Sequence, residues 1–360
     1  MHVGMAVIFQ GYDDPARDRE VYARELALAD QAEGLGFESI WAVEHHFTAY
    51  TMCPDPLQFL TYMAGRTKNV KLGSMVVVLP WHDPVRVAEH VSMLDMLSDG
   101  RFIFGVGRGL GRVEFDGFRI PMDEARSRFI ESATAVLEGL DRGYLEFSGE
   151  HFQIPRRELR PAPMASFRGR TYAAAVSPES VKIMAELGVG LLIIPQKPWA
   201  QVSAELDEYK TQYRLLRGEE PPAPIVAGWT FVDNDAKRAK DMAHQYMGGY
   251  YETVMDHYEF AAGHLAKQKG YEFYGKLTEN LDKHGKQGGI DFFTDLQVWG
   301  TPDMCLEKIE WIKTLTGAET YIAVCSYAGL EAAEADRNLK QVASDVMPTL
   351  KSWSPVLASV

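Results

Sequence analysis

The chain has 360 residues and a formal net charge of −13, and it is 46% hydrophobic and 24% charged. This composition is ordinary for a globular protein, whereas the scattered Lys and Arg residues argue against nucleic-acid binding. No apolar run is long enough to cross a membrane, and the N-terminus lacks the features of a secretion signal. The three cysteines, Cys53, Cys305 and Cys325, are far apart in the sequence. We therefore expect reduced thiols, no metal site and a cytoplasmic protein.

Strand-like and helix-like segments alternate through the first half of the chain. Apolar runs rich in β-forming residues predict strands at 3–9, 39–43, 70–79 and 101–106. Helical spacing of apolar residues predicts helices at 17–33, 85–97 and 123–140. After these, the Gly- and Pro-containing stretch 144–163 predicts an excursion with a small hairpin.

The alternation continues in the second half. Strands are predicted at 170–176, 190–195, 225–232 and 320–324. Helices are predicted at 178–187, 199–216, 235–267, 302–315 and 330–350, and Thr301-Pro302 is a helix-start signal. The stretch 270–295 is rich in Gly and charge and weakly periodic, so we expect a long mobile loop there.

About eight strands alternating with helices imply parallel strands joined by helical crossovers. An open, doubly wound sheet is the rival architecture. The strand count and the closing strand-helix pair favour a closed (β/α)8 TIM barrel. No break isolates a second core, so we expect residues 1–360 to form a single domain.

Two adjacent histidines, His45 and His46, follow the predicted strand 39–43. In a parallel α/β protein this is the carboxyl end of a strand, where ligands are usually held. Neighbouring side chains on an extended segment point to opposite faces, so we expect one of the two histidines to face a cavity. That histidine can act as a general acid or base; the alternative is a hydrogen-bonded structural pair.

The glycine-rich run from Gly105 to Gly111 follows another predicted strand. It does not satisfy GxGxxG and has no Walker lysine, so neither a dinucleotide fold nor a P-loop is indicated. We expect a flexible turn that lets a ligand approach the backbone, with Arg108 placed to bind an anion. The alternative is an ordinary barrel loop with a surface arginine.

The helix predicted at 178–187 begins with Ser177 as N-cap and Pro178 as first residue. Its N-terminus can bind phosphate, together with the Ser180 hydroxyl, if Arg108 and Arg126 lie at the same barrel mouth. The alternative is an ordinary capped helix. The chain has no GxSxG motif and no HxxxH metal site. The three histidines of the long helical stretch are expected to face solvent or a partner: His244, His257 and His264.

A set of motifs, taken together, resembles the bacterial luciferase-like flavin monooxygenases, including the luciferase α-subunit. They occur in the same order along the chain and are nearly gap-free in its first half. The motifs are WAVEHHF at 41–47, KLGSMVVVLPWHDP at 71–84, LDMLSDGRFIF at 94–104, RGL at 108–110, GFRIPMDEAR at 117–126, WGTP at 299–302 and DVMP at 345–348.

The resemblance implies a (β/α)8 barrel that binds FMN, or reduced FMN (FMNH2) as a diffusible cosubstrate, at its carboxyl-terminal mouth. By motif position, His45 matches the catalytic histidine of the family and Glu114 an acidic residue near the flavin. Met75-Val76 matches a cis non-proline peptide beneath the isoalloxazine ring. The remaining implied flavin contacts are Arg108 and Arg126 on the phosphate, the hydroxyls of Ser177 and Ser180, and the Val176 backbone.

Two positions depart from the luciferase pattern. A reactive cysteine of luciferase is replaced by Gly107, and a tyrosine by Gly111. The second half of the chain, which lines the substrate pocket in the family, aligns loosely. Flavin use is therefore implied more firmly than aldehyde oxidation or light emission.

The function implied by the resemblance is an FMN-dependent monooxygenase that uses O2 to oxidise a small organic substrate through a C4a-peroxyflavin. A mobile lid at 270–295 would exclude water from that chemistry. We expect a separate flavin reductase and a homodimer that forms through the helices near 56–65 and 84–97. Two alternatives remain: a deazaflavin-dependent hydride-transfer enzyme of the same superfamily, and a non-catalytic flavin-binding partner subunit.

Overall fold

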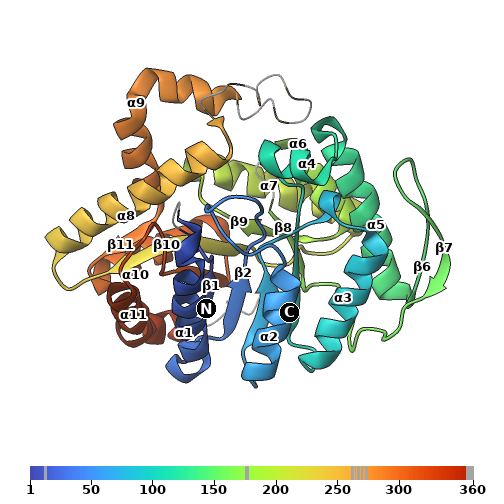
Figure 1. Cartoon of the computed structure of the whole chain (residues 1–360), viewed down its shortest axis with the longest axis horizontal. Coiled ribbons are helices and arrows are strands. Elements are labelled where there is room, and N and C mark those ends of the chain that lie inside the picture. Colours follow the sequence, from blue (N-terminus) through green and yellow to red (C-terminus); the bar gives the residue numbers. More distant parts are fainter. Residues whose placement is uncertain are drawn as a thin grey trace.

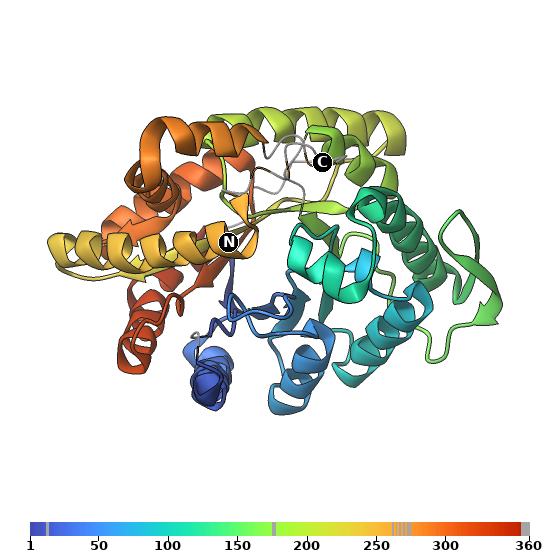
Figure 2. The same ribbon diagram turned by 45° about the horizontal axis from the view of Figure 1, so that its top comes forward.

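The computed structural model describes residues 1–11, 14–174, 178–260, 263, 265, 268, 271 and 275–353. Its parallel strands close into a barrel because β1 pairs with β2 on one side and with β12 on the other, while β9 pairs with β10 (Figures 1 and 2). The eight barrel strands are β1 (His2–Val7), β2 (Ser39–Ala42), β3 (Lys71–Ser74) with its continuation β4 (Val77–Val78), β5 (Phe102–Gly107), β8 (Thr171–Ala174), β9 (Gly190–Ile193), β10 (Ile225–Val232) and β12 (Thr320–Val324). This closure confirms the predicted (β/α)8 TIM barrel.

Helices surround the barrel and connect its strands, as Figure 2 shows. They are α1 (Asp18–Leu35), α2 (Pro56–Arg66), α3 (Pro84–Leu97), α5 (Ala125–Arg142), α6 (Pro178–Leu187), α7 (Trp199–Arg217), α8 (Ala236–His257), α10 (Pro302–Thr316), α11 (Ala332–Gln341) and α12 (Met347–Ser352). Three of them begin at an acceptor side chain followed by proline, at Asp55, Asp83 and Thr301. Each of these side chains accepts a backbone N–H of the first turn, and proline at the next position lacks the N–H that would have no partner there.

Trp41 on β2 fills the barrel interior and is completely buried. It pairs with Ala6 of β1 and Gly73 of β3. A Cβ atom at Gly73 would lie 2.3 Å from the Trp41 ring, and one at Gly4 would lie 2.9 Å from its Nε1 atom. Gly4 and Gly73, on the strands at either side of β2, therefore leave the space that the indole occupies. A close-packed core has no room for both the indole and a side chain at either of these positions.

Two excursions depart from the simple alternation of strand and helix. The antiparallel hairpin of β6 (Tyr144–Ser148) and β7 (Gln153–Glu158) projects beside α5 (Figure 1), which confirms the predicted hairpin. The stretch 270–295, which we expected to be a loop, is helical from its sixth residue onward. There α9 (Gly275–Leu296) changes direction at Gly285, whose φ of 67° is outside the helical region. It leads into β11 (Val298–Gly300), which pairs with β10.

A short helix, α4 (Arg112–Phe118), was missed by the sequence analysis. It begins directly after the glycine-rich run and has only seven residues, too few to give a clear helical period. It lies at the same end of the barrel as α9, at the top of Figure 1. The fold therefore places α4 over the carboxyl ends of the strands.

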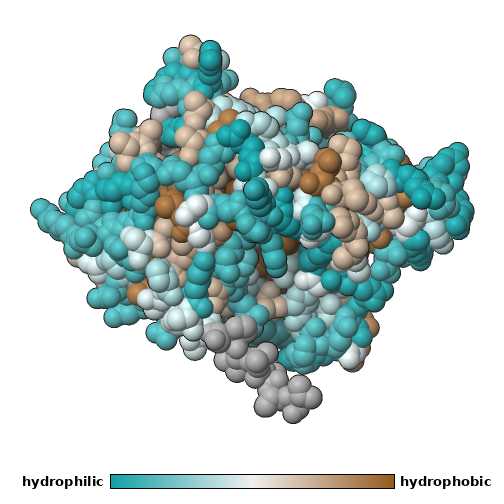
Figure 3. Space-filling model, turned by 90° about the horizontal axis from the view of Figure 1, so that it is seen from below, coloured by the Kyte–Doolittle hydropathy of each residue, from teal (hydrophilic) through white to brown (hydrophobic). Residues whose placement is uncertain are grey.

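The surface of the molecule is mostly polar, as expected for a chain with many charged residues (Figure 3). Seen from below, it is mostly hydrophilic, with hydrophobic residues in scattered patches (Figure 3). Among the described residues, no helix combines the length and apolar character that crossing a bilayer requires.

Candidate active site

A cavity at the carboxyl ends of the strands brings together side chains that are far apart in the sequence. Its lining includes every predicted site residue whose side chain the structure describes: His45, Met75, Val76, Arg108, Glu114, Arg126 and Ser180. The other two predicted residues, Val176 and Ser177, lie outside the described residues. Parallel strands end at the same edge of a sheet, which is why the segments after β2, β4, β5 and β9 meet here.

His45 faces this cavity, whereas His46 is buried behind it. The His45 side chain is 16% exposed, and its Nδ1 atom lies 3.0 Å from Oε1 of Glu114. His46 Nε2 instead lies 3.1 Å from Oε1 of Glu44, a carboxylate with no exposed side-chain surface. The prediction that one histidine of the pair faces a cavity is therefore confirmed.

Glu44 fixes the histidine loop to the neighbouring strand. Besides His46, it binds His82 Nε2 at 2.6 Å and accepts the backbone N–H of Val78 at 2.7 Å. Burial alone would raise the pKa of Glu44, but the hydrogen bonds from His46 and His82 outweigh it, so the pKa lies below its ordinary value. The loop that carries His45 is thus held by a buried anion with three hydrogen-bonding partners.

Glu114 on α4 holds His45 from the opposite side. Its Oε1 atom faces Nδ1 of His45 and accepts the backbone N–H of His46 at 3.0 Å. Burial opposes ionisation, but the positive charge of His45 and hydrogen bonds from His257 and His45 lower the pKa of Glu114 to about 2. The carboxylate is therefore ionised at neutral pH and can stabilise a protonated His45.

His257 was placed wrongly by the sequence analysis, which expected it to face solvent or a partner. It is the last residue of α8, and its side chain is only 1% exposed. Its Nε2 atom lies 3.5 Å from Glu114 Oε1, and its ring stacks on Tyr50. The signal was available but weak: His257 ends a stretch rich in aromatic residues, which is as typical of core as of a site.

One side of the cavity is formed by the peptide between Met75 and Val76, which is cis, as the resemblance implied. Ser74 precedes it, and its hydroxyl both donates to the carbonyl and accepts the N–H of Gly105, each at 2.8 Å. A Cβ atom at Gly105 would lie 1.8 Å from the Ser74 carbonyl oxygen, and one at Gly107 would lie 2.3 Å from Val76. These glycines are thus strand residues of β5 that let the cis segment approach, and the expected flexible turn is wrong for this part of the run.

Two cationic side chains, Arg108 and Arg126, also line the cavity. Arg108 lies over the Tyr271 ring at 4.0 Å, and the Tyr271 hydroxyl donates to the carbonyl of Gly109. Arg126 pairs with Glu179 at 2.5 Å, and Ser180 follows as the third residue of α6. Two guanidinium groups, a hydroxyl and the N-terminal end of a helix are a donor set that suits a phosphate.

Apolar side chains make up much of the remaining lining. Those lining the cavity are Val78, Trp81, Leu110, Phe129, Ile183, Met184 and Ile194. Gln196 and Tyr258 add polar groups that the sequence analysis did not identify. A pocket lined by apolar side chains, two arginines and one histidine–carboxylate pair fits a flat, largely apolar ring system that carries a phosphate.

His45, Glu114 and His257 are also close enough to share a metal ion, since one donor atom from each lies within 4.8 Å of the others. However, Oε1 of Glu114 already accepts the His46 amide proton and faces His45 Nδ1. Glu114 and His45 are therefore joined by a hydrogen bond, and His257 Nε2 lies 3.5 Å from the same oxygen. A second such group, Glu131, Glu150 and His151, lies on and near the hairpin excursion, away from the cavity.

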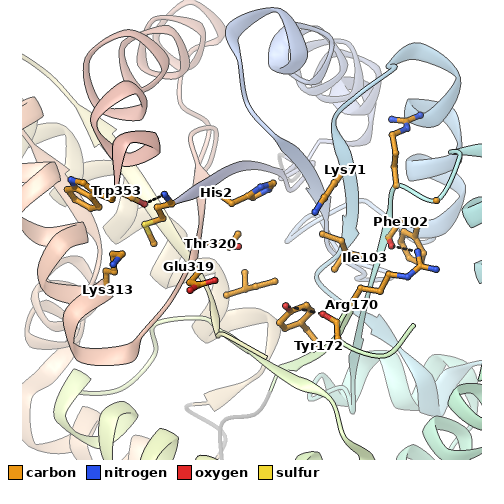
Figure 4. Close-up of a pocket in the computed structure, with 15 residues that line it drawn as sticks. His2, Lys71, Phe102, Ile103, Arg170, Tyr172, Lys313, Glu319, Thr320 and Trp353 are labelled. Carbon is orange, nitrogen blue, oxygen red and sulfur yellow. Dashed lines mark hydrogen bonds between the residues drawn. The ribbon is translucent and has the colours of Figure 1, made fainter. Parts of the chain in front are cut away.

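A second cavity lies at the amino ends of the strands, where His2, Lys71, Phe102 and Thr320 begin or nearly begin their strands (Figure 4). Its cationic groups are largely engaged. The N-terminal ammonium donates to the carbonyl of Leu350 at 2.9 Å, and Arg170 pairs with the buried Asp95. In a TIM barrel, this face stabilises the fold and the carboxyl-end face carries the chemistry, so the first cavity is the candidate active site.

Comparison with known proteins gives a family match over most of the chain. The family model described as luciferase-like monooxygenase matches residues 1–319. The alkanal monooxygenase alpha chain of the Kryptophanaron alfredi symbiont is 28% identical over 349 residues, which cover 95% of this chain and 97% of that protein.

Solved structures share the fold over nearly the whole chain. Monooxygenase RslO1 from Streptomyces bottropensis is 24% identical with a TM-score of 0.77, covering 97% of this chain and 99% of that one. The oxygenating constituent of 3,6-diketocamphane monooxygenase from Pseudomonas putida, in complex with FMN, is 19% identical with a TM-score of 0.72, covering 97% and 98%. An F420-dependent secondary alcohol dehydrogenase is 17% identical with a TM-score of 0.71, covering 95% and 97%. At these identities the likeness concerns the fold alone.

The lowered pKa of Glu114 predicts a loss of stability in acid. The folded state binds fewer protons than the unfolded state between pH 4.5 and about 2, so the free energy of unfolding should fall as pH decreases through that window. Glu114→Gln removes this contribution, about 3 kcal/mol at pH 7. Thermal and urea unfolding between pH 2 and 8 should show the variant less stable at pH 7 and nearly equal to wild type near pH 2.

Exposed Glu146 provides the control, because Glu146→Gln should leave the whole profile unchanged. If the stability of Glu114→Gln and wild type differed by the same amount at every pH, the ionised carboxylate would not be the cause.

Proposed function

Since residues 1–319 match its model, the chain belongs to the luciferase-like monooxygenase family, and we propose that it is an FMN-dependent member. It takes FMNH2 from a separate flavin reductase and uses O2 to oxidise a small organic substrate. The observation that carries this proposal is the single cavity shared by His45, Arg108, Arg126 and the Met75-Val76 peptide. These groups come from four different segments of the chain, and together they meet the three requirements of a flavin site: a ring platform, a phosphate anchor and a proton donor or acceptor.

The residues present fit FMN. Met75 and Val76 offer a surface for the flat ring, and Ile194 and Met184 add further apolar area. Arg108, Arg126 and Ser180 would hold the phosphate. Bound reduced flavin would supply the electrons for oxygen activation, and the protein supplies orientation and protons.

His45 is the proposed acid/base. Its Nδ1 atom faces the ionised Glu114, so the other ring nitrogen, Nε2, is the one left to exchange a proton within the cavity. When Nε2 gains a proton, the imidazolium is stabilised by the Glu114 carboxylate 3.0 Å from its Nδ1 atom. The apolar residues around it reduce the access of water to the reacting groups.

The arrangement of strands supports the proposal of a separate reductase. Apart from the hairpin of β6 and β7, every strand in the described part of the chain belongs to the barrel sheet. These strands leave no second sheet for a nicotinamide domain, and we propose that the chain works as a single domain over residues 1–360. The three cysteines are buried and unbridged, in keeping with a cytoplasmic protein.

A deazaflavin-dependent hydride transfer is the second candidate, because the F420-dependent alcohol dehydrogenase shares this fold. A non-catalytic flavin-binding subunit is the third. The cavity-facing His45 held by the buried carboxylate of Glu114 argues against that role, since a subunit that only binds flavin has no need of such a pair. FMN is favoured over F420 by the two arginines and helix end that suit one phosphate.

We also propose a homodimer formed through α2 and α3. Four large hydrophobic side chains on these helices are about half exposed: Tyr62 (49%), Met93 (50%), Met96 (46%) and Leu97 (55%). Exposed hydrophobic residues that gather on adjacent helices are typical of a protein interface.

The oxygen chemistry can be tested by stopped-flow mixing of protein-bound FMNH2 with O2. We expect an oxygen-dependent transient in the flavin absorbance that free FMNH2 does not give, and product from a long-chain alkanal or a diketocamphane used as probes. His45→Ala should retain FMNH2 but lose product formation. Reoxidation at the free-flavin rate would contradict the proposal, and tight F420 binding with hydride transfer would establish the second candidate instead.

The phosphate anchor can be tested by comparing FMN with riboflavin, which lacks the phosphate. Arg108→Ala should weaken FMN binding by about 1.5–3 kcal/mol, the worth of a charged hydrogen bond, and leave riboflavin binding nearly unchanged. Arg128 is a matched control because it pairs with Glu124 and does not line the cavity. Equal losses for both flavins, measured by fluorescence quenching, would remove Arg108 from the phosphate site.

The dimer can be tested by light scattering after size-exclusion chromatography. Met93→Glu with Leu97→Glu should convert the wild-type dimer into a monomer, because it places charges in the proposed interface. Leu215→Glu with Leu216→Glu on α7 changes similarly exposed residues elsewhere, 76% and 46% exposed, and should leave the dimer intact. A monomeric wild type would contradict the proposal.

A further inference from the structure

His257 is a buried, titratable residue to which the proposed reaction assigns no role. Its ring packs edge-on against His45 at 5.2 Å and stacks on Tyr50 at 4.6 Å, measured between ring centroids. Its Nδ1 atom lies 2.8 Å from the Thr48 hydroxyl oxygen, while its Nε2 atom faces Glu114. Both Thr48 and Glu114 are close to His45: Thr48 lies on the same loop and Glu114 binds the His45 ring.

The hydrogen-bond donors around His257 select one tautomer. The Tyr50 backbone N–H donates to the Thr48 hydroxyl oxygen at 3.4 Å, which leaves the hydroxyl proton available for His257 Nδ1. If Nδ1 accepts that proton, Nε2 carries the hydrogen and points it at Oε1 of Glu114, 3.5 Å away. The other tautomer would place the Nε2 lone pair against a buried anion, which is unfavourable.

The neutral form of His257 suits this arrangement. Burial lowers the pKa of His257, as does the nearby charge of His45, while Glu114 and Glu259 oppose the change. The other titratable groups against the ring are the phenols of Tyr50 and Tyr258. The ring therefore stays uncharged near neutrality and serves as an N–H donor.

Gly111 makes room for this contact. A Cβ atom at position 111 would lie 2.4 Å from Oε2 of Glu114 and 3.2 Å from Nε2 of His257. The backbone φ of Gly111 is −70°, which any residue can adopt, so the requirement for glycine here is one of space. Position 111 is also where the chain departs from the luciferase pattern.

We propose that His257 is a positioning residue that donates its Nε2–H to Glu114 and so sets how strongly Glu114 holds the proton on Nδ1 of His45. The inference rests on the proposed function only for the reaction in which His45 takes part. The contact itself depends only on residues of this chain: Gly111 leaves the space in which a second histidine, His257, approaches the Glu114 carboxylate. The Oε1 atom of the carboxylate lies 3.0 Å from His45 Nδ1 and from the His46 backbone N–H, and 3.5 Å from His257 Nε2, a buried nitrogen that makes no other hydrogen bond in the described part of the chain.

Removing the His257 donor should shift the pH profile of the reaction in a known direction. With fewer N–H groups on its carboxylate, Glu114 attracts the His45 proton more strongly. The midpoint of the pH profile for reoxidation of bound FMNH2 should therefore move upward.

The first test uses the protein without flavin. Nitrogen NMR of protein labelled with ¹⁵N-histidine should show His257 neutral at pH 7, with the proton on Nε2 and Nδ1 as an acceptor. His257→Phe identifies its signals by their loss. A proton on Nδ1, or a charged ring at pH 7, would overturn the proposal even if the protein never bound FMN. Failure of FMN binding alone would overturn the proposed function and leave this assignment standing.

The second test uses the pH profile. His257→Phe keeps the ring stacking and removes the donor, so we expect the midpoint to rise by about one pH unit and the rate well below the midpoint to fall about tenfold. His257→Gln restores an N–H donor and should return the midpoint to the wild-type value. His244, on the same helix, bonds the Lys240 carbonyl of its own turn, so His244→Phe should change neither quantity. FMNH2 affinity should stay within about twofold of wild type in all three variants, because none changes a residue proposed to hold the phosphate.

Gly111→Ala offers an independent route to the same change if His257→Phe fails to fold. The added methyl group should displace Glu114 from His257 and move the midpoint in the same direction as His257→Phe. Gly249→Ala on α8 is its control, since the new Cβ would make an ordinary 3.4 Å contact with Ala328. An unmoved midpoint in both Gly111→Ala and His257→Phe, or a shift in His257→Phe that glutamine does not reverse, would overturn the proposal.

Discussion

The candidate site depends on one buried carboxylate. Glu114 has no exposed side-chain surface, and an unpaired charge in such a place would be very unfavourable. It is stable because the loop after β2 delivers the His45 ring and the His46 amide to the same oxygen. The carboxylate, in turn, orients the ring so that a single nitrogen is left for chemistry. Fold stability and the protonation of His45 are therefore coupled through the same atoms.

A second buried carboxylate gives the histidine loop its rigidity. Glu44 joins His46 and His82 to the amide of Val78, so the loop after β2 is attached to the strand that follows the cis peptide. The adjacent histidines thus have separate tasks because they meet different carboxylates. His45 faces the cavity and Glu114, and His46 anchors the loop through Glu44. Extended backbone, which turns neighbouring side chains to opposite sides, makes this division possible.

Much of this arrangement could be predicted from the sequence, because it depends on local pattern. The alternation of strands and helices predicted the barrel fold. The predicted strand ends placed His45 and Arg108 at the carboxyl-end face of the barrel. The family resemblance supplied Met75-Val76 and Glu114. Two features could not be predicted, since they depend on contacts between distant segments. His257 is 143 positions from Glu114 in the sequence, and only the end of α8 brings it there. The short α4 helix, which carries Glu114, has no period that a sequence pattern could detect.

The glycines of the run from Gly105 to Gly111 link these observations. In the sequence these glycines suggest flexibility, but at three of the positions a side chain would not fit. A Cβ atom would clash with the Ser74 carbonyl at Gly105, with Val76 at Gly107 and with Glu114 at Gly111. A glycine that excludes a clash is a fixed part of the packing, because any side chain there would displace a neighbour. The same run therefore positions the peptide that would lie beneath a ring and the carboxylate that orients the histidine. A substitution at any of the three should affect the site through geometry, although none of these glycines has a side chain with which to bind a ligand.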